Sequence, residues 1–299
     1  MPSWSTLSQF LVSGLALGGV YALSGVGLVV LYRATGVLYL AFGAVGAVGA
    51  FIAWQMIQAS VPGWAAWIVC IAFGGAVTLI YGMIFGPPLA GRDPLVRAVA
   101  TLGLTLILLG IMDLVWPPTG GAARSISLPT DNGGFTIFGL QVIWTQVIAL
   151  GGAVALTAGT AAFLRFTKLG TAMRAMANDR VITGTPSVPV RRVEAAAWLG
   201  CGVLAGLAGL LLADLVKLDA ATLTFLVISS LAAALIAQLR SIAVTFAAAI
   251  VIGVIHDLLT PFTALTNYRD MTPFVLAVIA LLWTSRHRTV MMRSSEEAQ

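Results

Sequence analysis

Long apolar runs fill most of the chain, and short segments between them hold most of the polar residues. A helix of roughly 20 mainly apolar residues crosses the hydrocarbon core of a bilayer. The pattern predicts about nine such spans, with eight or ten as alternatives. The second is the span expected to be broken or re-entrant, because glycine recurs along it. The predicted spans lie near 9–32, 37–57, 64–86, 96–116, 141–164, 193–213, 221–238, 242–260 and 271–285.

Composition agrees with a membrane protein. Hydrophobic residues make up 59% of the chain, charged residues only 9%, and the mean hydropathy is +0.99. Soluble domains carry about 25% charged residues, so this composition cannot cover a water-facing surface. We therefore predict an all-α, multi-pass integral membrane protein, with residues 1–299 forming a single transmembrane domain.

The basic residues predict the orientation, because cytoplasmic loops of membrane proteins are enriched in Lys and Arg. With the N-terminus outside and nine spans, the outer segments hold only Arg124, Lys217 and Arg269 of the 16 basic residues. The topology is therefore N-outside and C-inside. The net charge of +5 reflects this topology and does not indicate a nucleic-acid partner. The inner segments hold Arg33, Arg92, Arg97, Arg165, Lys168, Arg174, Arg180, Arg191, Arg192, Arg240, Arg286, Arg288 and Arg293.

Two loops are long. The outer loop, about 117–140, is rich in proline and glycine and therefore in turns. The inner loop, about 165–192, contains a helix-forming run at 172–178 that is too polar to span a membrane. Such a helix either docks into a groove on a soluble partner or lies as a basic segment on anionic lipid.

Catalytic and metal-binding motifs are absent from the sequence. It has no G-x-x-x-x-G-K-[ST] phosphate loop and no H-E-x-x-H zinc motif. Cys70 and Cys201 lie in apolar runs without neighbouring metal ligands, so no metal site is predicted. Ser24 and His256 are the one pair that an intramembrane serine protease could use. We predict no enzymatic activity for the chain itself.

Four stretches occur in a definite order along the chain. They read Gly14-Leu-x-Leu-Gly-x-x-Tyr-Ala-Leu23, Ala41-Phe-Gly43 followed by Gly49-Ala-Phe51, Thr101-Leu-Gly-Leu-Thr105, and Leu169-Gly-x-Ala-Met-Arg-Ala-x-Ala-x-Asp179. In this order, and with the small-residue helix Gly202–Gly209 after them, they resemble the permeases of branched-chain amino acid-type ABC importers. The resemblance covers most of the chain.

The resemblance implies a set of partners. Separate ATPase subunits would bind ATP and Mg²⁺, a second permease, homologous or identical, would complete the path, and an extracytoplasmic solute-binding protein would deliver the solute. No cofactor is expected on this chain. The segment that docks on the ATPase would include Arg174, Ala175, Met176, Ala177, Asp179 and Arg180.

The chain also departs from the family pattern. Tyr39 stands where the family has Asn, and Phe42 where His or Gln follows the alanine. Pro186 and Pro189 interrupt the docking segment, so its helix should end before Pro186. The chain is thus a divergent member whose solute need not be leucine-like.

Polar and aromatic residues inside the spans are candidates for the translocation path. A threonine in a membrane helix can line the path or can donate to a carbonyl group of its own helix. A histidine near a span end can line the path or can reach the membrane interface. Both alternatives stay open for these residues. The candidates are Tyr39, Phe42, Gly43, Thr101, Thr105, Ser229 and His256.

The predicted function is that of an inner-membrane permease subunit of a bacterial ABC importer, which forms half of the path for an amino acid or a related small organic solute. An ion-coupled secondary transporter is the alternative. Such transporters tend to use buried carboxylates or broken helices near the midplane, and the predicted span centres contain no acidic residue.

Overall fold

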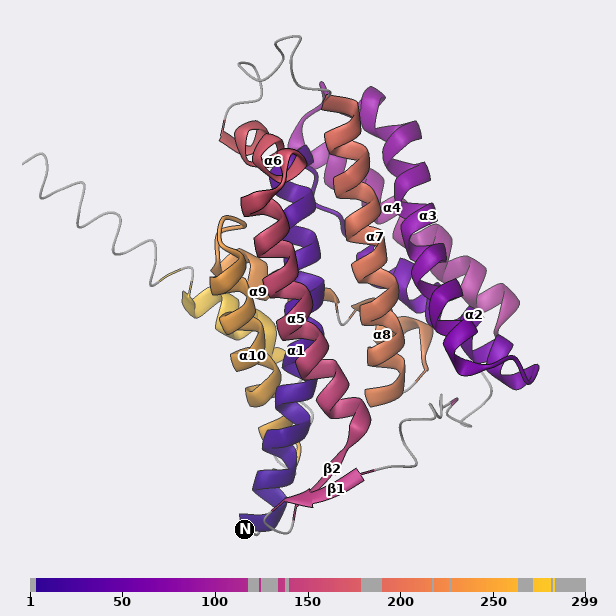
Figure 1. Cartoon of the computed structure of the whole chain (residues 1–299), viewed down its shortest axis with the longest axis vertical. Coiled ribbons are helices and arrows are strands. Elements are labelled where there is room, and N and C mark those ends of the chain that lie inside the picture. The colour runs from indigo at the N-terminus through magenta and orange to yellow at the C-terminus, as the bar shows by residue number, and fades with distance from the viewer. Residues whose placement is uncertain are drawn as a thin grey trace, which may run out of the picture.

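The computed structural model describes residues 4–117, 124, 134–137, 140–178, 190–216, 218–225, 227–262, 271–280 and 282. The chain is an all-α, multi-pass membrane protein with one small β-hairpin (Figure 1). The helices are α1 (Trp4–Thr35), α2 (Phe42–Gln58), α3 (Gly63–Leu89), α4 (Pro94–Val115), α5 (Trp144–Phe166), α6 (Lys168–Asn178), α7 (Val190–Leu215), α8 (Ala220–Phe225), α9 (Val227–Ile236) and α10 (Ile242–Leu258). A further helical segment, 272–280, is called the C-terminal helix below.

Every predicted span contains a helix in the described part of the chain. Among the residues that the structure describes, five helices are long and apolar enough to cross a membrane by themselves, namely α1, α3, α4, α5 and α7. The shorter apolar helices α2 and α10 match the second and eighth predicted spans, and α8 with α9 matches the seventh.

The second span differs from the prediction in where its helix begins. Helix α2 is continuous from Phe42, and the preceding residues 36–41 are not helical. Gly36, with φ of 69°, lets the chain leave α1 in a left-handed conformation that glycine tolerates. The glycines of α2 therefore do not break the helix.

The outer loop contains regular structure that the sequence analysis did not predict. Strands β1 (Gly134–Ile137) and β2 (Leu140–Ile143) pair antiparallel, with Gly134 opposite Ile143. The predicted fifth span thus starts too early, because its first residues belong to β2 and α5 begins at Trp144.

Helix α1 runs through the middle of the bundle and packs against α5, α7, α9 and α10 (Figure 1). Helix α7 packs against α2 and α3 on its other side. Glycines allow these helices to touch backbone to backbone, as small residues do in membrane bundles. A Cβ on Gly202 of α7 would overlap the carbonyl oxygen of Gly74 on α3, and one on Gly253 of α10 would overlap Gly18 on α1.

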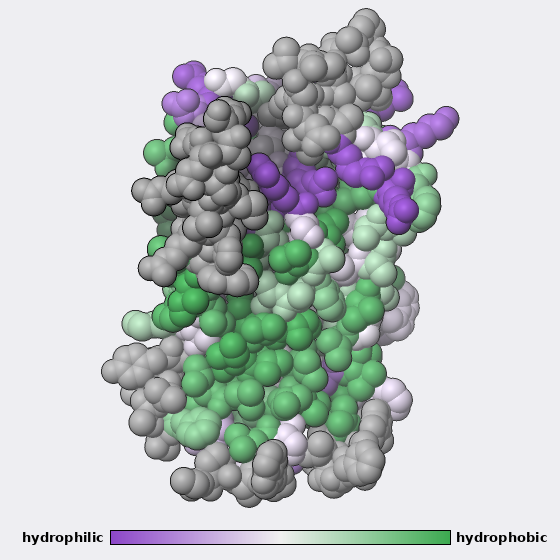
Figure 2. Space-filling model, turned by 90° about the vertical axis from the view of Figure 1, so that its left-hand side faces the viewer, coloured by the Kyte–Doolittle hydropathy of each residue, from purple (hydrophilic) through white to green (hydrophobic). Residues whose placement is uncertain are grey.

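Charged side chains collect at one end of the molecule. In Figure 2 hydrophilic residues gather near the end that α6 marks in Figure 1, and a broad hydrophobic surface extends below them. At this end Arg97 Nη1 donates to the Thr35 carbonyl oxygen at 3.4 Å, which joins the end of α1 to the start of α4. This is the end that the positive-inside bias assigns to the cytoplasm.

Single cysteines test that orientation. Thr171 on α6 and Gln58 at the end of α2 are both exposed and lie on opposite sides in the predicted topology. An impermeant thiol reagent should label Thr171→Cys only from the cytoplasm and Gln58→Cys only from outside. Native Cys70 and Cys201 are buried and should stay unlabelled. Labelling of both new cysteines from the same side would overturn the topology.

Candidate functional site

A cavity of about 440 Å³ lies between α1, the α8–α9 pair, α10 and the C-terminal helix. Its buried floor includes Leu17, Tyr21, Ser229 and His256, each less than 9% exposed. Ser229 and His256, which the sequence analysis selected separately, thus line one space although they come from α9 and α10. The exposed lining residues are Ala221, Thr222, Phe225 and Phe274. We call this space the outer cavity, because α8 follows a predicted outer turn.

A second and much smaller cavity, of about 20 Å³, lies between α1, α2, α7, α8 and α9. A space of this size holds about one water molecule. Phe42 and Gly43, both predicted path residues, line it together with Ser24 and Ser230. We call it the inner cavity. Tyr21 lines both the inner and the outer cavity.

Phe42 and Gly43 close the inner cavity by tight packing. Phe42 is 2% exposed, and its ring lies against Gly27 of α1. A Cβ at Gly43 would overlap the carbonyl oxygen of Thr224, so α2 touches the backbone of α8 here. Only glycine permits that approach.

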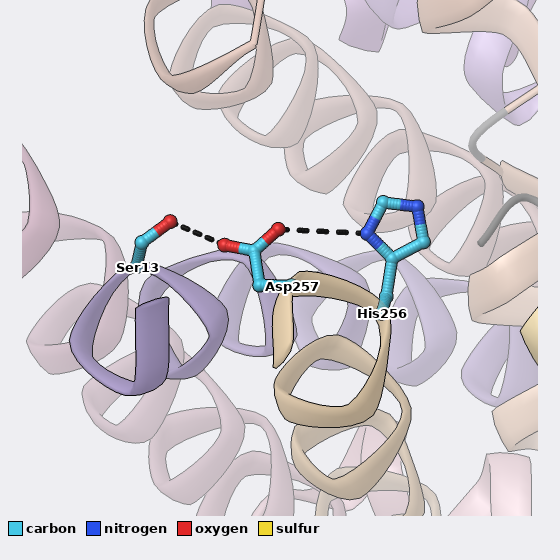
Figure 3. Close-up of polar contacts among 3 residues, drawn as sticks. All are labelled: Ser13, His256 and Asp257. Atoms are coloured by element: carbon cyan, nitrogen blue, oxygen red, sulfur yellow. Dashed lines mark hydrogen bonds and ion pairs between the residues drawn. The ribbon is translucent and has the colours of Figure 1, made fainter. Parts of the chain in front are cut away.

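His256 belongs to a chain of polar contacts at the end of α10 (Figure 3). The Ser13 hydroxyl on α1 donates to one carboxylate oxygen of Asp257, and the other carboxylate oxygen lies 3.5 Å from Nδ1 of His256. The Tyr21 ring meets the imidazole edge-on, at a centroid distance of 6.4 Å. These contacts fix the imidazole at the floor of the outer cavity.

The same contacts do not have the geometry of a serine hydrolase. In a catalytic triad the histidine lies between the serine and the acid, whereas here Asp257 lies between Ser13 and His256. The other candidate nucleophile, Ser24, donates to the Val20 carbonyl oxygen at 3.0 Å and lines the inner cavity. It does not share the outer cavity with His256.

The remaining path candidates lie apart from the two cavities. Thr101 accepts from the Leu40 amide at 3.1 Å, and its hydroxyl lies 2.9 Å from the Leu38 carbonyl oxygen, so it holds the non-helical segment 36–41 against α4. Thr105 donates to the Thr101 carbonyl oxygen of its own helix at 3.1 Å. Tyr39 packs edge-on against Trp198 at 5.3 Å. The roles of these three residues in translocation stay predictions.

The predicted docking helix forms, and it is longer than the sequence analysis expected. Helix α5 ends at Phe166 and α6 begins at Lys168, so Thr167 is the one residue between the two helices. The Thr167 hydroxyl donates to the Phe163 carbonyl oxygen at 2.7 Å and accepts from the Gly170 amide at 3.0 Å. A Cβ at Gly170 would overlap the backbone of Phe163 and Leu164, so this turn is tightly packed.

The side chains of α6 divide into a buried and an exposed face. Met173 is 3% exposed and belongs to the buried face. Arg174 is exposed, and its Nη2 donates to the Arg165 carbonyl oxygen at 3.4 Å. The backbone of Ala175, Met176 and Ala177 is helical, but their side chains lie outside the described residues, as do Asp179, Arg180 and the prolines at 186 and 189.

Tyr21 lines both cavities, but the sequence analysis did not select it as a path residue. It occurs in the first of the four stretches quoted above, among glycine, alanine and leucine, and there it was read only as part of a resemblance. The available signal was a phenol within a long apolar run. Thr222 lies at the mouth of the outer cavity. The sequence contains no signal for it, because it lies on a short helix at a span end.

The model of the family described as "Branched-chain amino acid transport system / permease component" matches residues 10–281. The chain belongs to this family. It is therefore a membrane-spanning permease subunit of an ABC importer, as predicted.

Relatives within the family match over nearly their whole length. The high-affinity branched-chain amino acid transport system permease protein LivH of Escherichia coli K12 is 24% identical, with 92% of each chain covered. A probable LivH of Methanocaldococcus jannaschii is 27% identical, over 86% of this chain and 82% of the relative. BraD of Pseudomonas aeruginosa is 24% identical, with 95% of each covered.

One solved structure supports the fold. PsaBC from Streptococcus pneumoniae in complex with Fab matches with a TM-score of 0.50 at 14% identity, over 91% of this chain and 90% of that chain. The likeness shows that the two chains share a fold.

Proposed function

We propose that this permease forms half of the translocation path of an ATP-driven importer for amino acids or related small organic solutes. A second permease, identical or homologous, supplies the other half. ATP and Mg²⁺ bind to separate ATPase subunits on the inner side, and an extracytoplasmic binding protein delivers the solute. The relatives from Escherichia coli and Pseudomonas aeruginosa support a bacterial inner membrane as the location.

The observation that carries the proposal is helix α6. It is packed against α1, α5 and α7 at the end of the molecule assigned to the cytoplasm (Figure 1). Its turn to α5 is hydrogen-bonded and tightly packed, and Arg165, Lys168 and Arg174 are exposed around it. A force applied to α6 by an ATPase subunit would therefore move α5, and with it α1, as a rigid body.

The lining of the outer cavity supports a small solute of low net charge. The outer cavity is lined mainly by apolar residues, with Tyr21, Thr222, Ser229 and His256 as its polar groups. Small-molecule sites commonly have this make-up. A branched-chain amino acid, which the relatives' names specify, has both an apolar side chain and polar ends.

Reconstitution tests this function. The permease is purified together with the ATPase and permease subunits that accompany it and is placed in liposomes with the binding protein. We expect uptake of radiolabelled L-leucine, or of another standard amino acid, that requires ATP on the inner side and stops with vanadate. Uptake that proceeds without ATP and follows a Na⁺ or proton gradient would instead establish a secondary transporter.

A further inference from the structure

Arg124 lies against the outer end of α2. It is one of three basic residues that the predicted topology places outside, where such residues are depleted. Its guanidinium carbon lies 5.3 Å from the centre of the Trp54 ring and 5.9 Å from that of Phe51. At these distances a cation is attracted to the face of an aromatic ring. Arg124 is therefore held against the last two turns of α2, which ends at Gln58.

The same guanidinium caps the outer end of α4. Its Nη1 donates to the Trp116 carbonyl oxygen at 3.1 Å, and its Nη2 donates to the Pro117 carbonyl oxygen at 2.9 Å. The last carbonyl groups of a helix have no partners within the helix and carry partial negative charge, so a cation there is stabilising. The Arg124 carbonyl oxygen accepts from the Leu218 amide at 3.1 Å, which adds the segment between α7 and α8.

Trp116 completes this cluster. Its ring stacks on Phe51 at a centroid distance of 5.3 Å, and its Nε1 donates to Gln55 Oε1 at 3.2 Å. We call Arg124, Phe51, Trp54 and Trp116 the outer clasp. It joins α2 to α4 by stacking, by charge and by hydrogen bonds.

Helix α4 is fastened to α2 at both ends. Little of α4 is buried, and it packs on α2 and α8. At its inner end Thr101 bonds to Leu38 and Leu40, in the segment that leads into α2. At its outer end the clasp makes the connection. The polar contacts at the two ends therefore hold a helix that has little other support in the described part of the chain.

We propose that Arg124 is a positioning residue for transport. Through the outer clasp it makes the outer ends of α2 and α4 move as one body when the permease opens and closes its half of the path. The proposal rests on the proposed function and adds to it which helix ends keep their contact. In rigid-body transitions some packed elements move together while others shift against them.

The geometry favours this role over the binding of an anion from outside. Both terminal nitrogens of Arg124 donate to carbonyl groups of the chain, and its guanidinium lies over two rings. An anion would have to replace these contacts. Lysine could not reproduce them, because it lacks the planar fork that meets two acceptors at once.

Substitution of Arg124 is the first test. In the reconstituted importer Arg124→Ala should lower ATP-driven uptake of L-leucine, or of the amino acid that the complex accumulates, roughly fivefold. The ATPase rate without binding protein should stay unchanged. Arg124→Lys should fall between the two, because it keeps the charge but loses the fork. Trp54→Leu should behave like Arg124→Ala, and Trp64→Leu is its matched control, since Trp64 is 70% exposed on α3 outside the clasp.

A cross-link separates positioning from stability. Gln55→Cys and Trp116→Cys place one thiol at the outer end of each helix, at side chains that contact each other, while Cys70 and Cys201 are buried. A short bifunctional methanethiosulfonate reagent should join the two new thiols. In the Arg124→Ala background the cross-link should restore most of the uptake, and a reducing agent should remove the gain. With Arg124 intact the cross-link should leave uptake unchanged.

The outcomes separate this inference from the proposed function. Loss of uptake on cross-linking with Arg124 intact would overturn the proposal, because the helix ends would then have to separate during transport. Wild-type uptake in Arg124→Ala, or no restoration by the cross-link, would overturn it as well. If the wild-type complex takes up no solute with ATP, the importer function fails and melting temperatures decide the clasp. Falls for Arg124→Ala and Trp54→Leu that are less than additive in the double variant support it, and additive falls overturn it.

Discussion

Replacing Gly202 by Leu should prevent α7 from packing on α3 and should remove most of the folded permease. A Cβ at this position would meet the Gly74 carbonyl oxygen, and it would lie 2.6 Å from Thr78 Oγ1 and 2.7 Å from Thr78 Cβ. Overpacking of a core usually costs about 1–3 kcal/mol. Here the obstacle is backbone, which cannot move aside like a flexible side chain, so the cost should exceed that range.

Gly200→Leu is the matched control for this change. Gly200 lies two residues away on α7, is exposed, and apart from the backbone of its own helix and its two chain neighbours has no atom within 4 Å of the Cβ that would be added. Leucine forms helices better than glycine by about 0.8–1.0 kcal/mol, so this variant should be as stable as the wild type or more so. The measurement is the melting temperature and the monodisperse yield after detergent extraction. Equal values for the two leucine variants would mean that α3 and α7 do not pack as the structure shows.

The sequence predicted the spans because hydropathy depends only on local composition. It failed at the start of α5 for the same reason. Three of the four residues from Leu140 to Ile143 are apolar and they directly precede the helix, and such a short run fits a strand as well as a helix. Only pairing with Gly134–Ile137 makes them a strand.

The candidate site was predictable in part. Ser229 and His256 stand out as polar residues in apolar runs, so the sequence identifies them, but it cannot show that α9 and α10 bring them to one cavity. Tyr21 lines both cavities only because helices that are distant in the sequence surround it. Thr101 shows the same limit, because it bonds both within α4 and to the segment at Leu38 and Leu40. The pattern allowed the bond within its own helix but could not show the contact with Leu38 and Leu40.

Arg174→Glu or Ala175→Pro should abolish the stimulation of ATP hydrolysis by the solute-loaded binding protein, while the permease still folds and inserts. Proline at 175 removes a hydrogen bond of α6 and clashes with the preceding turn, at a cost of about 3 kcal/mol, and so should bend or break the docking helix. Arg174 is exposed when the permease chain is considered without its partners. In an interface it could be buried only opposite an acidic partner residue, and breaking such a buried pair costs about 3–5 kcal/mol.

Lys168→Glu distinguishes docking from simple attraction to lipid. Lys168 is also exposed and basic, and it lies on α6 outside the predicted docking residues. If α6 docks on an ATPase through Arg174, Lys168→Glu should keep most of the stimulation, since an exposed charge pair contributes only about 0–1 kcal/mol. ATPase activity in proteoliposomes, with and without the loaded binding protein, gives the comparison. Full stimulation in Arg174→Glu, or an equal loss in Lys168→Glu, would show that α6 is a basic segment on the lipid surface and that the ATPase docks elsewhere.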